Sequence, residues 1–499
     1  MMVFLMLLLL HAVFGHPCDT VEGNFNGWLN DAEERDVVVV GGGVAGLSAM
    51  NKFLNTINPV RNVVLLEALD RLGGRVSTVR TELNSGEVLT EDGAEWIHGG
   101  KGNFLFHLAK EQNALAPKLG DNDWEVWLKR QNGANADERG FDLAKEILWK
   151  CDSRKALEPY YLYNKDMGYG QCHEDKFNQW YDSSRTRQYE KDAWHHYLHQ
   201  YLNKDEGTDT WLDISARDAD HFTDWGFDQW DQWKDGYETL TKYLKSSIPD
   251  SKVKLSSPVC RIFWDEQDLN NRALVVTKAG ESFLAKHVIV TTSVGYLGDR
   301  HLQLFIPKLP RNFAEHLEGV KLGVADKIQL GWDKPWWGNK PLDLTVIWTQ
   351  KNLPQEKTWL YGILEFLGVH QQPNLIQAFI TGTYAKAMEN LPEESVYSDI
   401  LELLSNISRT SLPDPTFFRR TTWGRDEWFF GSYNSYVTPE GSDAGLTSRK
   451  PLAQPITNSQ GKSVIFWAGE HTHTKRYGTV DGAMKKGKEV AKKLKDMLK

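Results

Sequence analysis

The sequence predicts an α/β fold organised around a Rossmann-like nucleotide-binding unit, and four consecutive features near its N-terminus support this fold class. Residues 36–40 are an apolar, β-branched run that is too short for a helix and typical of a strand buried on both faces of a sheet. A glycine-rich segment over 41–46 follows, and a helical pattern over 47–54 continues it. A second apolar run over 62–67 completes a strand, turn, helix and strand within about 30 residues, which is the order of a dinucleotide-binding unit.

The residues of this unit have distinct expected roles. Gly41 makes the tight turn, Gly43 lets the backbone approach a pyrophosphate, and Gly46 allows the helix to pack closely on the strand. Ala45 lies in the same turn, just before the helix, whose N-terminal free N–H groups favour the negative charge of the pyrophosphate. Glu67, at the end of the second strand, can accept hydrogen bonds from both hydroxyls of an adenosine ribose, so an unphosphorylated ribose is favoured.

The composition limits what the rest of the chain can be. The 499 residues carry 58 Lys plus Arg against 67 Asp plus Glu, a formal net charge of −9, and 40% of them are hydrophobic. This length and apolar content allow two or three domains with sizeable cores. The acidic balance argues against nucleic acid as the main partner, because phosphate binding needs clustered Lys and Arg, and it is compatible with a cationic substrate.

The N-terminus predicts export. Residues 1–15 are apolar without a charged side chain, and the short residues Val13 and Gly15 suit cleavage before His16. We therefore expect a signal peptide at 1–15 and a secreted protein, with no membrane span in the mature chain. An uncleaved anchor is the alternative, because the segment lacks a basic residue, although about 15 residues is short for a bilayer span. Asn406, in an Asn-Ile-Ser sequon, permits an N-glycan in that pathway.

The four cysteines, Cys18, Cys151, Cys172 and Cys260, match neither a zinc site nor a disulfide-dense scaffold. We expect no metal site. Cys151 and Cys172 lie close in sequence, and in an oxidising compartment they either pair or remain two buried free thiols.

Three separated blocks resemble the flavin-containing amine oxidases. The second strand runs into Gly-Gly-Arg at 73–75, and residues 92–99 read Asp-Gly-Ala-Glu-Trp-Ile-His-Gly. The C-terminal part contains Phe-Trp-Ala-Gly-Glu-His-Thr at 466–472 and Gly-Thr-Val-Asp-Gly-Ala at 478–483. The blocks stand in the family's order across nearly the whole chain. The resemblance, which is to the polyamine and spermine oxidase type, implies an FAD-dependent enzyme.

The resemblance also assigns the FAD contacts. Arg75 would meet the phosphates and ribityl chain, Val259 would hold the adenine through its backbone, and Glu470 would bind the ribityl hydroxyls. The remaining implied contacts lie against the flavin ring or hold its pyrimidine side, and they are Gly93, Ala94, Trp96, Thr479 and Val480. Monoamine oxidases attach their flavin to a cysteine near the closing motif, but this chain has no cysteine after Cys260, so we expect non-covalent FAD.

The N-terminal and C-terminal motifs must meet on one cofactor, so the FAD-binding domain is expected to be discontinuous. We assign to it residues 33–105, 246–305 and 426–499. Residues 106–245 and 306–425 then form an α+β substrate-binding domain, as in the flavin amine oxidase architecture.

The resemblance places the catalytic and substrate-binding roles as well. Lys327 matches the lysine that family members keep beside the flavin, where a cation could help dioxygen reduction; a surface lysine is the alternative. His98 takes the position where animal spermine and acetylpolyamine oxidases carry a histidine at the substrate tunnel; a histidine bonded to backbone is the alternative. Tyr433 and Thr479 would line the substrate face of the flavin. Glu206 is our candidate for the carboxylate that binds the second ammonium of a polyamine, and an exposed acidic loop is the alternative.

The expected function is therefore that of a secreted, FAD-dependent polyamine oxidase. It would oxidise a secondary amine C–N of spermine, spermidine or their acetylated forms by hydride transfer to the flavin, with imine hydrolysis and reduction of dioxygen to hydrogen peroxide. An L-amino-acid oxidase of the same fold is one alternative, and it needs an arginine for the substrate carboxylate. A non-catalytic flavoprotein is the other.

Overall fold

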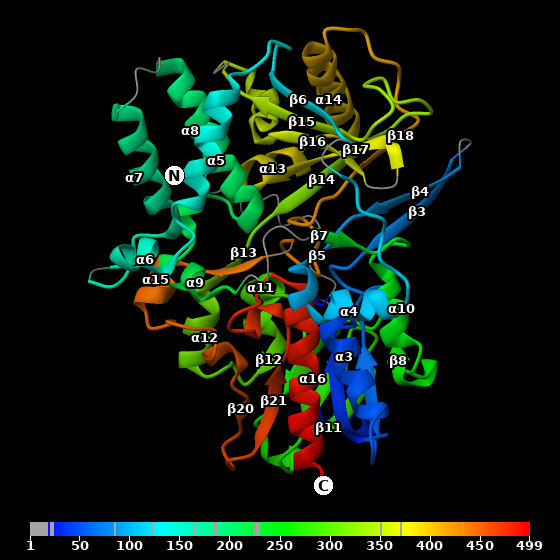
Figure 1. The fold of residues 1–499 in the computed structure, drawn as a ribbon. Helices are drawn as coiled ribbons and strands as arrows, with labels where there is room; N and C mark the ends of the chain where they lie inside the picture. Colours follow the sequence, from blue (N-terminus) through cyan, green and yellow to red (C-terminus); the bar gives the residue numbers. More distant parts are fainter. Residues whose placement is uncertain are drawn as a thin grey trace.

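A computed structural model gives the fold of the chain and describes residues 18–19, 24–83, 86–120, 123–163, 165–183, 188–223, 225, 230–349, 352–369, 372–432 and 434–499. The expected signal peptide at 1–15 and Tyr433 lie outside the described residues. Two large sheets organise the rest, one in the lower half and one in the upper half of Figure 1.

The lower domain is built on a nine-stranded sheet in the order β12-β9-β10-β11-β1-β2-β8, with β21 paired to β11 and β20 paired to β21. Its strands are β1 (Glu33–Val40), β2 (Val63–Leu66), β8 (Val253–Lys254), β9 (Val259–Phe263), β10 (Ala273–Thr277), β11 (Ser282–Val290), β12 (Phe305–Ile306), β20 (Ile456–Thr457) and β21 (Ser463–Trp467). The strands β2, β1, β11 and β21 are parallel neighbours. Residues 37–40 of β1 and all four residues of β2 are buried, which explains the continuous apolar runs in the sequence.

Helices cover both faces of this sheet. They are α3 (Val44–Leu54), α10 (Glu238–Lys245), α11 (Val294–Leu304), α12 (Arg311–Glu318) and α16 (Val480–Met497). The first and last of them, α3 and α16, lie side by side (Figure 1). A Cβ on Gly487 of α16 would lie 2.1 Å from the carbonyl oxygen of Ala45 in α3, so only glycine allows this approach. The two ends of the chain therefore meet in one domain, as the discontinuous arrangement requires.

The upper domain is built on a six-stranded sheet in the order β18-β14-β17-β16-β15-β6. Its strands are β6 (Glu125–Arg130), β14 (Ala325–Gly331), β15 (Leu342–Ile347), β16 (Glu365–Val369), β17 (Gln372–Thr381) and β18 (Phe417–Arg420). Helices α13 (Gly382–Glu389) and α14 (Glu393–Ser408) share its hydrophobic core. A separate helical unit beside it contains α5 (Glu138–Trp149), α6 (Arg154–Leu157), α7 (Tyr169–Ser183), α8 (Gln188–Glu206) and α9 (Ala216–His221).

Smaller elements connect the two domains. Three two-stranded ribbons pair β3 (Thr78–Leu83) with β4 (Gly86–Glu91), β5 (Trp96–His98) with β7 (Trp230–Gln232), and β13 (Val320–Leu322) with β19 (Ser435–Val437). The other α-helices in the described part of the chain are α2 (Phe25–Asp31), α4 (Phe104–Glu111) and α15 (Pro439–Asp443). The described 3₁₀ turns are η2 (Gly100–Gly102), η4 (Glu158–Tyr160), η5 (Trp211–Asp213), η6 (Asp250–Lys252), η7 (Gln267–Leu269), η8 (Gln355–Gly362), η9 (Pro451–Ala453) and η10 (Glu470–Thr472).

The packing moves two of the expected domain boundaries. Residues 230–245 pack with the lower domain, because β7 pairs with β5 and the side chains of α10 are buried in the same core as α3. Residues 306–322 also join it, because the ring of Phe313 stacks on Trp467 at 4.7 Å. Both segments are held by partners that are distant in sequence, which the sequence alone does not reveal.

All four cysteines form disulfides. Cys151 pairs with Cys172 in the helical unit, so the alternative of two free thiols is wrong. Cys18 pairs with Cys260 across 242 residues of sequence, a pairing without a local signal in the sequence. Within the described part of the chain, no helix is both long and apolar enough to cross a membrane.

Candidate active site

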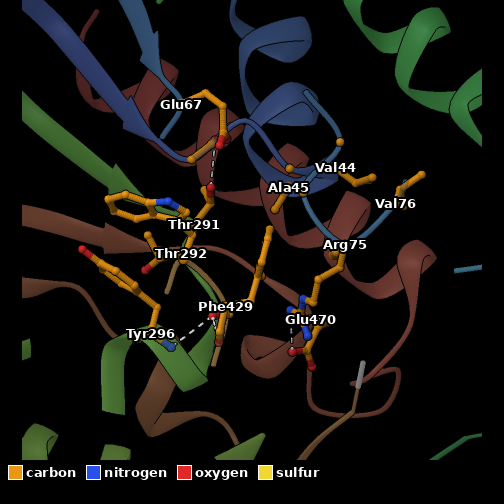
Figure 2. Close-up of a pocket in the computed structure, with 18 of the residues that line it drawn as sticks. Val44, Ala45, Glu67, Arg75, Val76, Thr291, Thr292, Tyr296, Phe429 and Glu470 are labelled. Carbon is orange, nitrogen blue, oxygen red and sulfur yellow. Dashed lines mark hydrogen bonds and ion pairs between the residues drawn. The ribbon is translucent and has the colours of Figure 1, made fainter. Parts of the chain in front are cut away.

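A first cavity runs along the ends of β1, β2 and β11 at the glycine turn (Figure 2). Ten of the residues expected to contact FAD line it, and they are Gly41, Gly43, Ala45, Glu67, Arg75, Ala94, Val259, Glu470, Thr479 and Val480. They come from both ends and the middle of the chain. The fold therefore brings the separated motifs to one surface, and we call this hollow the cofactor cavity.

The glycines of the turn differ in what surrounds them. Gly41 has a φ of +103°, a conformation that residues with a side chain rarely adopt. A Cβ on Gly46 would lie 2.0 Å from the carbonyl oxygen of Gly41, so this glycine sets the helix-to-strand distance. Gly43, in contrast, has open space beside it. A Cβ on Gly43 would lie 3.9 Å from its nearest neighbour, the Gly73 carbonyl oxygen, which leaves the room that a pyrophosphate needs.

Glu67 closes one end of the cofactor cavity. Its buried carboxylate accepts hydrogen bonds from the backbone N–H groups of Gly42 and, at 2.9 Å, Leu69. Burial raises the pKa of this carboxyl, and the two backbone bonds oppose that rise. The side chain is thus held in position at the end of β2, where a ribose would reach it.

The other end of the cofactor cavity is an ion pair. Arg75 Nη2 lies 3.0 Å from Glu470 Oε1, and Arg75 Nη1 donates to the carbonyl oxygen of Ser432 at 2.9 Å (Figure 2). Glu470 also accepts from the Ser435 hydroxyl at 2.6 Å and from the Gly478 N–H at 2.8 Å. Burial acts to raise the pKa of Glu470, but Arg75 and these donors outweigh it and the pKa is lowered. The carboxylate that the sequence assigns to the ribityl chain is therefore ionised and fixed.

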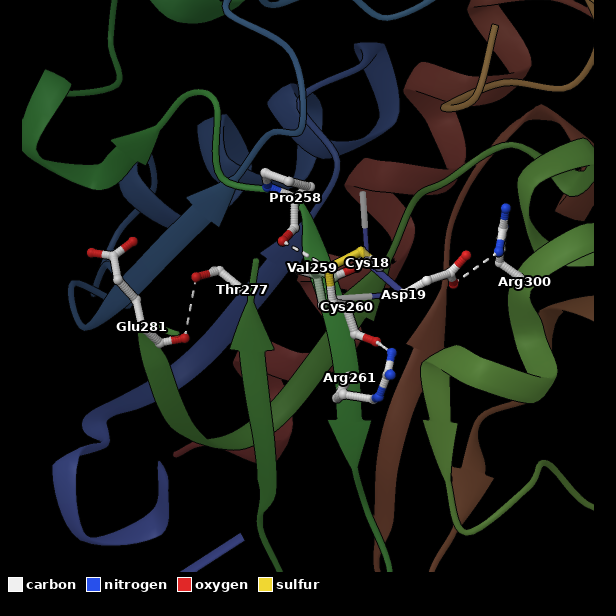
Figure 3. The surroundings of a disulfide bond; sticks show 9 residues. All are labelled: Cys18, Asp19, Pro258, Val259, Cys260, Arg261, Thr277, Glu281 and Arg300. Atoms are coloured by element: carbon white, nitrogen blue, oxygen red, sulfur yellow. Dashed lines mark hydrogen bonds and ion pairs between the residues drawn. A yellow bond between two sulfur atoms is a disulfide. The ribbon is translucent and has the colours of Figure 1, made fainter. Parts of the chain in front are cut away.

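The adenine end rests on a strand that a disulfide ties down. Val259 lines the cofactor cavity at the start of β9, and its neighbour Cys260 is bonded to Cys18 (Figure 3). The next residue, Asp19, is also held in place, because its carboxylate pairs with Arg300 Nη1 at 3.3 Å. The N-terminal segment thus anchors the strand that sequence reasoning assigns to the adenine.

A second and larger cavity, of about 750 Å³, lies between the two domains and is called the substrate cavity below. Arg75, Ala94, Thr479 and Val480 line both cavities, so the two meet at these residues. Of the other expected site residues, Gly93, Trp96, His98 and Lys327 line the substrate cavity. Gly46 lines neither cavity, in keeping with its packing role.

Lys327 is a buried residue of β14 on the wall of this cavity. Its ammonium donates to the carbonyl oxygens of Glu91 at 2.8 Å and Gly93 at 3.1 Å, and to Glu95 Oε2 at 2.8 Å. The alternative of a surface lysine is therefore wrong. The cation is fixed against the segment expected to contact the flavin.

Glu95 is a site residue that sequence reasoning missed. Besides the ammonium of Lys327, its carboxylate accepts from Gln377 Nε2 at 2.9 Å and from Gln232 Nε2 at 2.9 Å. These donors come from β17 and β7, far away in sequence. A signal for Glu95 was present in the Asp-Gly-Ala-Glu-Trp block, where a charged residue stands between two expected flavin contacts.

His98 and Thr479 lie where their expected roles require. His98 ends β5 on the wall of the substrate cavity, and its carbonyl oxygen accepts from Asn103 Nδ2 at 2.9 Å. Thr479 caps α16, accepting from the Gly482 N–H at 3.1 Å and donating to the Arg476 carbonyl oxygen at 2.8 Å. Their contacts with substrate and cofactor stay predictions.

Glu206 departs from its expected role, because it lines neither cavity. Its carboxylate is turned to Asn434 Nδ2 at 3.4 Å, and its pKa is raised to about 8, chiefly by burial and then by Asp205 and Asp152. Asp205 and Lys204 line the substrate cavity instead. One residue along an α-helix turns the side chain by about 100°, so a small alignment error selects the wrong neighbour.

Carboxylates neutralise the cations of the substrate cavity. Each Lys and Arg among its described lining residues is paired, in the pairs Arg75–Glu470, Lys118–Asp231, Lys204–Glu365 and Lys327–Glu95. Further lining carboxylates, including Asp205 and Asp343, add negative charge. The described wall therefore suits a cation and offers no unpaired arginine to a substrate carboxylate.

These features define a class of protein. A nucleotide cavity with a βαβ glycine turn opens into a second, acidic cavity past a buried lysine, which is the arrangement of a flavoprotein oxidoreductase acting on amines. The chain belongs to the flavin containing amine oxidoreductase family, which matches residues 44–495. It is an FAD-dependent amine oxidase.

Relatives of known name agree with this assignment. The chain is 28% identical to peroxisomal N(1)-acetyl-spermine/spermidine oxidase of Bos taurus, covering 92% of this chain and 94% of that protein. The protein of the same name from Homo sapiens is 27% identical with the same coverage. A solved structure of putrescine oxidase bound to putrescine superposes with a TM-score of 0.67 at 19% identity, covering 93% of this chain and 100% of the other. The last likeness shows the fold.

Proposed function

We propose that this protein is a polyamine oxidase that oxidises a secondary amine C–N of spermine, spermidine or their acetylated forms and releases hydrogen peroxide. The observation that carries the proposal is the charge of the substrate cavity: its cations are paired with carboxylates, and further carboxylates remain. A linear polycation would gain favourable interactions along such a wall, because opposite charges in a partly dehydrated cavity attract strongly. The names of the bovine and human relatives support the same substrate class.

Residues on the wall of the substrate cavity have distinct roles in this proposal. FAD, when bound, supplies the acceptor for the hydride from the carbon beside the amine nitrogen. Trp96 and Ala94 form the wall against which the substrate is oriented. His98 offers a ring nitrogen to hold an amine by a hydrogen bond. Lys327 keeps a fixed positive charge on the wall of the substrate cavity, where it would favour negative charge developing on dioxygen during reoxidation.

The two alternatives predict different behaviour. An L-amino-acid oxidase needs an arginine for the substrate carboxylate, and each cation among the described lining residues already has a carboxylate partner. A non-catalytic flavoprotein would hold FAD and produce no peroxide with any amine. Neither alternative has an observation of its own in its favour.

The test is a peroxide assay on the purified, FAD-loaded protein with spermine, spermidine, N(1)-acetylspermine, putrescine and L-leucine at matched concentrations. We expect a catalase-sensitive signal with the polyamines and none with leucine. Activity with leucine alone would overturn the proposal in favour of an amino-acid oxidase. An FAD-loaded protein that is inactive with every amine would overturn it in favour of the non-catalytic alternative.

We also propose that the protein is secreted and carries non-covalent FAD. Two disulfides support an oxidising compartment, and they leave no free thiol for a flavin attachment. Asn406 is exposed on α14, where a glycan would fit. Expression of the full chain in cells with a secretory pathway should release a protein beginning at His16, with a glycosidase-sensitive mass that Asn406→Gln removes. A protein retained in the cytosol with residues 1–15 intact would contradict secretion.

A further inference from the structure

Asp231 is a buried carboxylate on the wall of the substrate cavity that the proposed roles leave unused. It is the middle residue of β7, directly opposite Ile97 of β5 in the ribbon. Its neighbours in that ribbon are the cavity residues Trp96 and His98 on one strand and Gln232 on the other. Because side chains alternate along a strand, the Asp231 carboxylate lies on the face of the ribbon that it shares with Ile97, and it lines the substrate cavity beside Lys118.

The two oxygens of Asp231 have different surroundings. Oδ1 lies 3.1 Å from the ammonium of Lys118, while Oδ2 is buried and has no hydrogen-bond partner among the described residues. Only 2% of the Asp231 side chain is exposed. A buried carboxylate oxygen without a donor is unfavourable in a folded protein, so a group that displaced Lys118 and also donated to Oδ2 would stabilise this carboxylate.

Lys118 is a partner that can leave. Its side chain is 57% exposed, against 21%, 20% and 5% for Arg75, Lys204 and Lys327, the other cations of the cavity. A lysine can swing from such a position into water, where its ammonium is fully hydrated, at little cost. The carboxylate has no such option, because its own strand is held in the ribbon with β5.

We propose that Asp231 binds an ammonium group of the substrate and that the ammonium of Lys118 occupies this position until the substrate displaces it. The inference rests on the proposed function and deepens it, because it names a site for a charged nitrogen of the polyamine other than the one that is oxidised. The chemistry of the displacement is balanced, since one ammonium replaces another on the same carboxylate. A small ammonium has three N–H donors and can serve both oxygens, whereas the tethered lysine reaches one.

If the Lys118–Asp231 pair had only a structural role, the expected effect of Lys118→Met on substrate binding would have the opposite sign. If the Lys118–Asp231 pair only latched the cavity wall, removing either partner would weaken the wall in the same way. If Asp231 is the binding group and Lys118 its competitor, the two removals act with opposite sign. Asp231→Asn then loses the site, and Lys118→Met frees it while keeping the apolar stem of the side chain.

The experiment measures spermine binding without turnover. Holoenzyme reduced with dithionite under anaerobic conditions cannot oxidise the amine, so calorimetric titration gives a dissociation constant. We expect about tenfold weaker binding for Asp231→Asn, the size of effect typical of a lost charged hydrogen-bonding partner, and about threefold tighter binding for Lys118→Met. Asp250→Asn is the matched control, because Asp250 forms a 2.6 Å pair with Lys245 that lies outside the cavity, and it should leave binding unchanged.

The outcomes separate this inference from the proposed function. Weaker binding in both Asp231→Asn and Lys118→Met, with a parallel loss of thermal stability, would overturn the inference in favour of a latch. Unchanged binding in both variants would overturn it as well. If wild-type protein neither binds nor oxidises spermine, it is the proposed function that fails. Lys118→Met changes an exposed side chain, so it tests the inference even if Asp231→Asn does not fold.

Discussion

The cofactor cavity and the substrate cavity are built in different ways. The first is formed mainly by backbone at the ends of parallel strands, and its glycines are fixed by contacts within one turn, as between Gly46 and the Gly41 carbonyl oxygen. The second is formed by side chains from both domains, and its charges are fixed by partners that lie far apart in sequence, as Lys327 and Glu95 do. Sites made by local backbone geometry are sharply specified by a short motif, whereas sites made by pairing side chains depend on the whole fold.

Adding a side chain in the glycine turn should have the largest effect on the cofactor cavity. We expect Gly46→Ala to lose FAD binding and to lower the free energy of unfolding by about 4 kcal/mol or more, because the new Cβ would meet the backbone oxygen of Gly41 at 2.0 Å. The flavin absorbance of the purified protein and its unfolding in urea measure both effects.

Gly298→Ala is the control for that substitution. Gly298 lies within α11, and a Cβ there meets no atom within 4 Å. Alanine should therefore leave FAD content unchanged and stabilise the helix by about 1 kcal/mol. Equal losses in both variants would mean that the turn has no special role.

The same contrast explains what the sequence could predict. The nucleotide-binding unit follows from consecutive residues, because a β-branched run, three glycines and Glu67 at the right distance leave few alternatives. The resemblance to a family added Lys327 and His98, and the structure places both on the wall of the substrate cavity. The choice of Glu206 rested on no motif, because the helix α8 lies in a divergent insertion, and in the structure Glu206 lines neither cavity.

Long-range partners could not be predicted at all. The Cys18–Cys260 disulfide and the Lys118–Asp231 pair join residues whose sequence neighbourhoods contain no sign of each other. Each forms only because the sheet and ribbon pairings bring two distant segments together. Prediction of such contacts needs the topology first, which is why the charge of the substrate cavity emerges only from the structure.

In the substrate cavity, the comparable test is to remove one partner of the Lys327–Glu95 ion pair. Lys327→Met should lower the rate of flavin reoxidation by about a hundredfold, if the fixed cation serves dioxygen, and should lower the free energy of unfolding by about 3 kcal/mol. The loss of stability arises because Glu95 is left as a buried, uncompensated charge. Stopped-flow reoxidation and urea unfolding measure the two effects separately.

The double variant Lys327→Met with Glu95→Gln tells the two effects apart. It removes both charges, so stability should return toward the wild-type value while reoxidation stays slow. Recovery of the reoxidation rate in the double variant would show that Lys327 acts only by neutralising Glu95.

A pH dependence of stability, small at any one pH step, sharpens the comparison by testing the electrostatics beside Lys327. Glu91 is buried beside Lys327, and burial is the main cause that raises its pKa to about 8. In the unfolded chain this carboxyl ionises near its ordinary pKa of 4.5, so between pH 4.5 and pH 8 the unfolded state gives up a proton that the folded state keeps. Stability must therefore fall as the pH rises through this window, by about 1 kcal/mol per pH unit.

Glu91→Gln isolates that contribution, because a neutral amide mimics the protonated carboxyl and does not titrate. The variant should match the wild type near pH 5 and become progressively more stable than it toward pH 8, in urea unfolding at each pH. All other titrating groups are shared by the two proteins, so the difference between their curves belongs to Glu91. A constant difference across this range would mean that Glu91 is already ionised in the folded protein. Lys327 and the donors to Glu91 would then outweigh burial, as Arg75 and the donors to Glu470 do in the cofactor cavity.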